Sequence, residues 1–384
     1  MFPDLERYRL EFPVTRSSIY LNHAAISPLP ARVRNAMRGI IEDRYEFAME
    51  HFASWLNGIE AVRASAARFL NASPTEIAFV KNTSEGISLF ANALDSAKGD
   101  EVVSVEGEFP ANYYPWKVLE KRGARLRLVR QSKGEFGIEA IERLLTPRTR
   151  VVTLSFVQFL SGFRANLEEL GRLCQSRGVL LFVDAIQGMG AFPIDVKKAQ
   201  IAGLSAGSHK WLMGPEGCAI LFVRQDLAEK MSPATVGWTS FEGWEQFDPS
   251  SLTWRSGAGR FECGSLSVAI LYGLGAALDL LQEAGIEAIG ERLLSLTDRL
   301  RRGLTERGYK IYGPLERDHA SGIVSFESRQ GSAEDLIAFL ENHRVMGSAR
   351  SSMVRLSPHF YNTEDEIDRV LELLANHGTS PSHS

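Results

Sequence analysis

The feature that most constrains the fold is an alternation of short apolar runs with segments of helical periodicity between residues 76 and 223. The apolar runs predict strands at 76–80, 101–105, 124–129, 150–157, 179–185 and 218–223. Helical periodicity falls between them at 84–94, 112–121, 137–145 and 166–177. Such alternation favours an α/β fold, in which helices cover both faces of a mostly parallel sheet. Ligands of these sheets bind where loops open a crevice at the carboxyl ends of the strands.

The C-terminal third of the chain has a different pattern. A length of 384 residues exceeds the roughly 250–300 residues at which a single core stops growing. We therefore expect a large domain over residues 15–262 and a small α+β domain over residues 263–384, which residues 1–14 join. The segment 235–260 carries Trp238, Trp244 and Trp254 among small residues and is expected to be a long structured loop. Beyond it, helices are predicted at 267–284, 290–307, 333–343 and 363–377, and strands at 322–327 and 353–357.

Composition excludes several classes of partner. The formal net charge of −4 provides no basic field for nucleic acid or anionic lipid, so a small-molecule partner is expected. The longest apolar stretch, near residues 268–281, is too short to span a bilayer. Three widely spaced cysteines predict neither a zinc ribbon nor a disulfide framework and favour a reducing cytoplasm. The histidines form no metal-binding motif, so no metal is expected.

The most informative chemistry lies between Val179 and Gly217. A strand of apolar residues ends at Asp184, and a second segment ends in Ser208-His209-Lys210. The separation, 210 − 184 = 26 residues, is long enough for one crossover to return the chain to the same sheet edge. Pyridoxal 5′-phosphate (PLP) needs this pair, because its aldehyde forms a Schiff base with a lysine and its pyridine nitrogen needs a carboxylate to stay protonated. Taken singly, Asp184 could instead be an ordinary strand-end acid and Lys210 a solvated lysine.

Two further segments follow strands and open helices. Residues 81–86, Lys-Asn-Thr-Ser-Glu-Gly, combine free backbone N–H groups with two hydroxyls and would suit a phosphate; a plain helix cap is the alternative. Residues 108–116 carry aromatic side chains, of which Phe109 could stack on a pyridine ring. Packing into the core is the better interpretation of Tyr114 and Trp116.

Taken together, D-A-x-Q at 184–187, S-H-K-W at 208–211 and N-T-S-E-G at 82–86 resemble the class V aminotransferases of PLP fold type I. That group includes cysteine desulfurases, isopenicillin-N-epimerase-like proteins and kynureninases. The resemblance extends from residues 19–30 to residues 355–368. It implies a mostly parallel, seven-stranded sheet in the large domain and a homodimer with shared active sites. Trp238 and Trp254 would suit such an interface, where aromatic residues are enriched.

The resemblance also assigns roles to single residues. It implies that Lys210 is the Schiff-base lysine and Asp184 the partner of the pyridine nitrogen, and that Gln187 bonds the phenolate oxygen. Phe109 would stack on the ring, and Arg355 would bind the substrate α-carboxylate through its guanidinium fork. The phosphate would be held by Thr83, Ser84, Ser208 and His209, and across the subunit boundary by Gly264 and Ser265. The substrate pocket would be lined by Asn22, His23, Ala24 and Ala25.

The sequence also departs from the cysteine desulfurases. These enzymes need a nucleophilic cysteine shortly before the carboxylate-binding arginine, and residues 343–355 contain none. Cys174 and Cys218 are predicted core residues, and Cys263 lies in a different segment. Phe159 stands where the desulfurases carry an asparagine, for which Gln158 is the candidate substitute. Chemistry through an enzyme persulfide is therefore not expected.

Three interpretations stay open. The first is a PLP enzyme acting on an α-amino acid, foremost an aminotransferase, with a lyase or an epimerase as alternatives. The second is a catalytically reduced PLP-fold protein with a binding or regulatory role, against which Lys210, Asp184 and Arg355 argue. The third is an α/β enzyme without PLP, which the absence of a Gly-rich phosphate-binding fingerprint disfavours. Arg355 could also pair with Glu364 or Asp365 on the surface, and Arg350 could serve a second substrate carboxylate or be a solvated charge.

Overall fold

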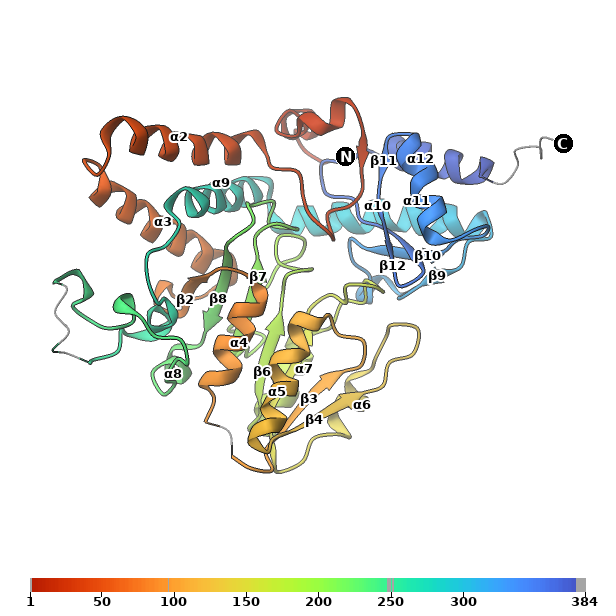
Figure 1. Ribbon diagram of the computed structural model, residues 1–384. Helices are drawn as coiled ribbons and strands as arrows, with labels where there is room; N and C mark the ends of the chain where they lie inside the picture. Colours follow the sequence, from red (N-terminus) through yellow and green to blue (C-terminus); the bar gives the residue numbers. More distant parts are fainter. Residues whose placement is uncertain (1, 96, 247–249, 251, 378–384) are drawn as a thin grey trace.

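The computed structural model describes residues 2–95, 97–246, 250 and 252–377. A seven-stranded sheet occupies its centre, with the strand order β2-β8-β7-β6-β5-β3-β4 (Figure 1). The strands are β2 (Ile77–Val80), β3 (Glu101–Val105), β4 (Arg125–Val129), β5 (Thr149–Ser155), β6 (Leu180–Asp184), β7 (Gly203–Gly207) and β8 (Ala219–Val223). Five strands from β4 to β7 run parallel, and β8 is antiparallel to both of its neighbours. The expected α/β architecture is confirmed.

Alternate residues of each strand supply two apolar layers. On one face, Ile77 and Phe79 of β2 join a cluster that includes α3 (Phe52–Leu70), α7 (Leu167–Ser176) and α9 (Val268–Ala284). On the other face, Ala78 and Val80 pack with α4 (Thr83–Ala93) and α5 (Tyr114–Val118). The period of two in a strand explains this division, since successive side chains point to opposite faces. The rigid sheet holds the ends of its strands in fixed positions.

Strand β7 was not among the predicted strands. Its sequence, Gly-Leu-Ser-Ala-Gly, has neither an apolar run nor an alternating pattern. All five residues are nevertheless buried at the centre of the sheet. A Cβ atom at Gly203 would lie 2.4 Å from the Phe90 ring and 2.8 Å from the Phe182 ring. Close packing of those two rings therefore requires the smallest residue at this position, and the packing is invisible to a periodicity analysis.

The remaining helices depart from their predicted bounds in places. The helix predicted at 112–121 is divided into a 3₁₀ turn at Pro110–Asn112, α5, and a second 3₁₀ turn at Leu119–Arg122. Pro115 explains why a new helix begins there, because it has no N–H to continue an earlier one. The helix predicted at 137–145 is shortened to α6 (Ile138–Glu142). A short α8 (Gln225–Ala228) follows β8, and α1 (Leu5–Arg9) lies near the N-terminus.

A smaller antiparallel sheet forms the C-terminal part. Its strand order is β12-β13-β10-β9, with β9 (Ile311–Tyr312), β10 (Val324–Glu327), β12 (Ser348–Arg350) and β13 (Met353–Leu356). Its apolar cluster includes α10 (Ile286–Glu306), α11 (Ala333–Asn342) and α12 (Glu364–Asn376). The N-terminal strand β1 (Ile19–Tyr20) pairs in parallel with β11 (Val345–Met346), so the N-terminal segment lies beside the C-terminal part (Figure 1).

Helix α9 connects the two parts. It packs against α2 (Ala31–Phe47) and α3, and its Leu271, Leu274 and Leu278 belong to an apolar cluster of the large sheet. The division of the chain after residue 262 stays a prediction. Within the described ranges, no single helix is both long and apolar enough to cross a membrane, and α9 with α10 meets that criterion only as a pair bent by 77°.

Candidate active site

The carboxyl ends of β6 and β7 bring the two central residues together. Strand β6 ends at Asp184 and β7 at Gly207, and Asp184 pairs with Ser205 in the parallel ladder. His209 and Lys210 follow β7 directly, so they lie at the same sheet edge as Asp184. A cavity of about 310 Å³ opens there. Its lining consists of Ala24, Ala25, Asn82, Thr83, Ser84, Phe109, Ala111, Phe159, Asp184, Ile186, Gln187, His209, Lys210, Arg350 and Arg355.

Lys210 presents an amine of lowered pKa to this cavity. Its Nζ lies 5.6 Å from the centre of the Phe109 ring. Burial lowers the pKa of Lys210 to about 8; the Asp184 carboxylate opposes this shift, and the Arg355 and Arg350 guanidiniums add to it. A lysine must be neutral to attack an aldehyde, so the lowered pKa suits Schiff-base formation.

Asp184 supplies a buried negative charge. The residue is 1% exposed, and its Oδ1 accepts a hydrogen bond of 3.1 Å from the Ile186 backbone N–H. Burial raises the pKa of Asp184 to about 7; the Ile186 N–H opposes the shift and the nearby Glu108 increases it. A buried carboxylate is costly unless a cation pairs with it. The protonated nitrogen of a pyridine ring meets that requirement.

The N-terminus of α4 forms another wall of the cavity. Asn82 caps the helix by accepting a hydrogen bond from Glu85 N at 2.9 Å, so neither Thr83 nor Ser84 is the cap that the sequence suggested as an alternative. Thr83 is buried and its Oγ1 accepts a hydrogen bond from Gly207 N at 2.9 Å, whereas Ser84 is exposed. With His209, these residues offer the backbone and side-chain donors that a phosphate needs.

The side-chain amide of Gln187 is held by two hydrogen bonds. Its amide nitrogen donates to Ala24 O at 2.9 Å, and its Oε1 accepts from Trp211 Nε1 at 2.8 Å. These bonds fix the amide and hold the segment of Ala24 and Ala25 over the cavity. Together, the Lys210 amine, the Asp184 carboxylate, the α4 N-terminus and the Phe109 ring match the aldehyde, ring nitrogen, phosphate and ring face of PLP.

Five predicted site residues lie outside the cavity lining; Gly264 and Ser265 lie in a separate pocket, and Asn22, His23 and Ser208 lie close to the cavity but do not line it. His23 is fully buried, with Nδ1 bonded to Ser357 O and Nε2 to the Tyr361 hydroxyl, both at 2.8 Å. Asn22 forms an isolated bridge with Ser357. Ser208 is buried and donates its hydroxyl to Pro215 O. The structure therefore brings together Lys210, Asp184, Thr83, Ser84, Phe109, Gln187, His209, Ala24, Ala25 and Arg355, and keeps Asn22, His23 and Ser208 behind them.

Arg355 is a buried arginine without an acidic partner among the described residues. It is 2% exposed, its Nη1 donates to Phe159 O at 2.8 Å, and its buried Nε has no hydrogen-bond partner. Burial and the nearby Arg350 lower the pKa of Arg355 to about 10. The alternative surface pairing with Glu364 or Asp365 is wrong, because Arg355 is buried and forms no salt bridge with a described acidic residue, and Glu364 pairs with Arg292. An unpaired guanidinium at a cavity wall fits a carboxylate ligand.

Two phenylalanines form the aromatic part of the lining. The rings of Phe109 and Phe159 meet edge to face, with centroids 5.3 Å apart. Gln158 does not take the cavity position considered for it, because it is buried and donates to Glu108 Oε1 at 2.7 Å. Sequence reasoning missed Glu108, which also accepts from the Ser155 N–H at 2.7 Å and the Asn112 amide at 3.2 Å. A glutamate directly before an aromatic residue, in the loop after a strand, was the available signal.

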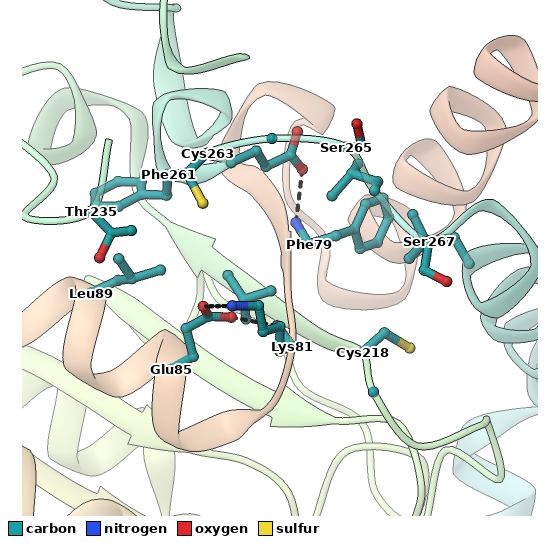
Figure 2. Close-up of a pocket in the computed structure, with 16 residues that line it drawn as sticks. Phe79, Lys81, Glu85, Leu89, Cys218, Thr235, Phe261, Cys263, Ser265 and Ser267 are labelled. Carbon is teal, nitrogen blue, oxygen red and sulfur yellow. Dashed lines mark hydrogen bonds and ion pairs between the residues drawn. The ribbon is translucent and has the colours of Figure 1, made fainter. Parts of the chain in front are cut away.

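Gly264 and Ser265 lie in a separate pocket of about 270 Å³. Figure 2 shows Ser265, Cys263 and Phe261 across from Lys81 and Glu85, which form an ion pair of 3.4 Å (Figure 2). Cys218 also lines this pocket. Burial raises the pKa of the Cys218 thiol to about 11 and that of Cys174 to about 12. None of the three cysteines, all within the described residues, lines the cavity of Lys210.

The fold and the cavity together define a PLP-dependent enzyme of fold type I. The model of the family described as Aminotransferase class-V matches residues 19–370. The chain belongs to this family, which confirms the resemblance, the fold class and the cofactor. Among curated relatives, the cysteine desulfurase of Serratia proteamaculans is 30% identical, with 96% of this chain and 97% of the relative covered. An uncharacterised aminotransferase of Bacillus subtilis is 27% identical, with 96% and 97% covered.

Solved structures agree with this assignment. The apo cysteine desulfurase of Thermococcus onnurineus superposes with a TM-score of 0.90 at 26% identity, over 99% of this chain and 98% of that chain. A cystine C–S lyase, solved with its product cysteine persulfide, superposes with a TM-score of 0.88 at 24% identity, over 95% and 99% of the two chains. At that identity, the second likeness shows the fold alone.

Proposed function

We propose that the protein is an aminotransferase that acts on an α-amino acid. One observation carries the proposal: the amine of Lys210, the carboxylate of Asp184 and the unpaired guanidinium of Arg355 all border one cavity that no cysteine lines among the described residues. Bound PLP supplies an electron-withdrawing ring that stabilises negative charge at the substrate Cα. The chain's own residues must then bind the substrate and move its protons.

Eight residues of the cavity have a defined part in that task. Thr83, Ser84 and His209 would hold the phosphate, Gln187 would bond the phenolate oxygen, and Phe109 would cover a face of the ring. Asp184 would keep a proton on the ring nitrogen. Arg355 would donate two parallel N–H···O bonds to the α-carboxylate, which fixes the Cα–H bond relative to Lys210. The Lys210 amine, whose pKa is lowered, would take the Cα proton and return it at a neighbouring carbon.

A PLP-dependent C–S lyase is the second candidate. Several relatives are named cysteine desulfurase, which supports chemistry at a Cβ–S bond. A persulfide route needs an accessible thiolate beside the substrate. Cys174 and Cys218 are buried with raised pKa values, and the partly exposed Cys263 does not line the cavity of Lys210. A lyase of this kind would therefore release its sulfur product directly. Epimerisation is a weaker candidate, and a purely regulatory role is weaker still, because the lysine, aspartate and arginine are all retained.

The experiment that separates these functions is a panel of amino acids. The PLP-loaded protein is incubated with each amino acid, with and without a keto acid as amino acceptor. Keto acid that forms only with the acceptor supports the aminotransferase. Ammonia or sulfide released without the acceptor indicates the lyase, and racemised amino acid without either product indicates the epimerase. The aminotransferase proposal is wrong if an acceptor never changes the products.

The homodimer and the cytoplasmic location also stay proposals. Gly264 and Ser265 lie outside the cavity of their own subunit, which is consistent with a role toward a partner's phosphate. Trp238, which is 46% exposed, lies in the same region and lines a further pocket with both residues. Sedimentation equilibrium of the PLP-loaded protein tests the dimer, and a fully active monomer would contradict it.

A further inference from the structure

Arg350 lies in the same cavity as Arg355 but has no role in the chemistry described so far. It ends β12, and Arg355 lies on the neighbouring strand β13. The register pairs Arg350 with Met353 and Ser348 with Arg355. Because alternate residues of a strand share a face, both arginines project from one face of the hairpin as diagonal neighbours.

The turn of the hairpin fixes this arrangement. Ser351 and Ser352 have φ values of 47° and 67°, in the left-handed region. Two consecutive residues of this kind form the two-residue turn whose twist matches that of an antiparallel pair. The turn leaves no spare residue between the strands, so the offset of Arg350 from Arg355 is set by the backbone.

The charges of this face are not compensated within the described residues. Neither Arg350 nor Arg355 forms a salt bridge with a described acidic residue, and the one hydrogen bond of the Arg350 side chain goes to the neighbouring Ala349 O at 3.1 Å. The buried Oγ of Ser348 and Nε of Arg355 also have no hydrogen-bond partner. Asp184 is the carboxylate that lines the cavity, whereas Lys210, Arg350 and Arg355 all bring positive charge to it. A site with two guanidiniums and few acids selects an anionic ligand.

We propose that Arg350 is a specificity-determining residue that binds a second carboxylate of the substrate, so that the protein prefers dicarboxylic amino acids. The inference rests on the proposed function, because Arg355 takes the α-carboxylate. Arg355 is buried and fixed by Phe159 O, which suits the group next to the reacting carbon. Arg350 is exposed and thus lies where the cavity opens to solvent, which suits the distal end of a substrate.

The test compares Arg350→Gln with the matched control Arg344→Gln. Arg344 is also exposed, lies six positions earlier (350 − 344 = 6) and is absent from the cavity lining, so the control removes the same charge elsewhere. Calorimetry on the PLP-loaded proteins measures the Kd of succinate and of butyrate, which have four carbons each but differ in the second carboxylate. In parallel, kcat/KM is measured for aspartate, glutamate and alanine.

The wild type should bind succinate more tightly than butyrate. Arg350→Gln should weaken succinate binding, and kcat/KM for aspartate or glutamate, by about 10- to 100-fold, the size of one charge-assisted hydrogen-bonded contact. Butyrate and alanine should change by less than about threefold, and Arg344→Gln should behave as the wild type. Arg350→Lys, which keeps the charge but not the fork, should give intermediate values.

The inference is overturned if Arg350→Gln leaves succinate binding unchanged, or weakens both acids equally. Calorimetry decides this even if no amino acid is turned over. If no amino acid is turned over but Arg350→Gln still weakens succinate binding, the proposed function fails and the inference about Arg350 stands. If alanine and aspartate are converted equally well by both proteins, the proposed function stands and the inference about Arg350 fails.

Discussion

The amide of Gln158 donates a hydrogen bond of 2.7 Å to Oε1 of Glu108, and this bond joins the loops that follow β5 and β3. Each partner directly precedes a phenylalanine of the cavity, Phe159 and Phe109, whose rings meet edge to face. Glu108 also accepts hydrogen bonds from the N–H and the hydroxyl of Ser155. A buried acid with four donors around it thus determines where two aromatic walls of the cavity lie.

We expect Glu108→Gln to disturb the cavity while retaining the shape of the side chain. The new amide would direct donors at the N–H of Ser155 and the amide of Gln158, so the free energy of unfolding should fall by about 1–3 kcal/mol. The loss of the charge should also lower the pKa of Asp184, which Glu108 raises. Denaturant unfolding and the pH profile of the PLP absorption band measure the two effects.

Glu106→Gln is the matched control, because Glu106 lies two positions earlier and does not line the cavity. If both variants shift the pH profile equally, Glu108 has no specific effect on the site. If Glu108→Gln lowers stability alone, it serves the fold and does not position the cavity.

Lys210→Ala should abolish covalent attachment of PLP. The Lys210 Nζ is the lysine amine that lines the cavity, so no other described lysine can reach an aldehyde bound there. Borohydride reduction followed by mass spectrometry should find PLP on Lys210 of the wild type and no labelled lysine in the variant. Lys198→Ala, a surface lysine paired with Glu168, is the control and should label normally. Stoichiometric labelling of the Lys210→Ala protein would refute the assignment.

The rate of PLP uptake should follow the lowered pKa of Lys210. The neutral amine attacks the aldehyde, and burial lowers the pKa of this amine from 10.5 to about 8. The rate should therefore rise with pH up to about 8 and then level off, whereas an ordinary lysine would keep accelerating to higher pH. Arg350→Gln removes a positive charge that lowers this pKa, so its curve should move to higher pH. Stopped-flow absorbance of the cofactor-free protein measures both curves, and coincident curves would contradict the electrostatic coupling.

Asp184→Asn should slow proton movement at the substrate Cα far more than it affects folding. An amide cannot hold a proton on the ring nitrogen, so the ring loses much of its capacity to stabilise negative charge. Exchange of the Cα proton with solvent deuterium, followed by NMR, should slow by orders of magnitude. Because the Asp184 carboxylate is buried with a raised pKa, its loss should not lower stability, and the unfolding midpoint serves as the control. Exchange at the wild-type rate would show that Asp184 is not the partner of the nitrogen.

Sequence patterns could predict the site wherever its residues follow recognisable strands. The run ending at Asp184 and the motif around Lys210 located the centre of the cavity, because parallel strands end at a common edge. Strand β7 was missed because it has glycine at position 203, where a buried strand normally has an apolar side chain. The rings of Phe90 and Phe182 leave no room there for a Cβ atom. Glu108 was missed because its partners Ser155 and Gln158 are 47 and 50 residues away. The position of Arg350 depends on the register of a hairpin, which no local pattern encodes.

Arg355→Lys should weaken substrate binding in a way that loss of the cysteines does not. Arg355 is held from β13 by its bond to Phe159 O, so its fork is presented from a rigid strand, and a lysine cannot reproduce two parallel N–H donors. We expect kcat/KM for amino acids to fall by an amount equivalent to about 2–4 kcal/mol, with KM raised. Replacement of Cys174, Cys218 and Cys263 by alanine should leave activity largely intact, because none of them lines the cavity of Lys210. Steady-state kinetics of both variants measures this, with the PLP spectrum as the check on folding. Loss of all activity in the cysteine-free protein with an unchanged spectrum would instead establish a thiol mechanism.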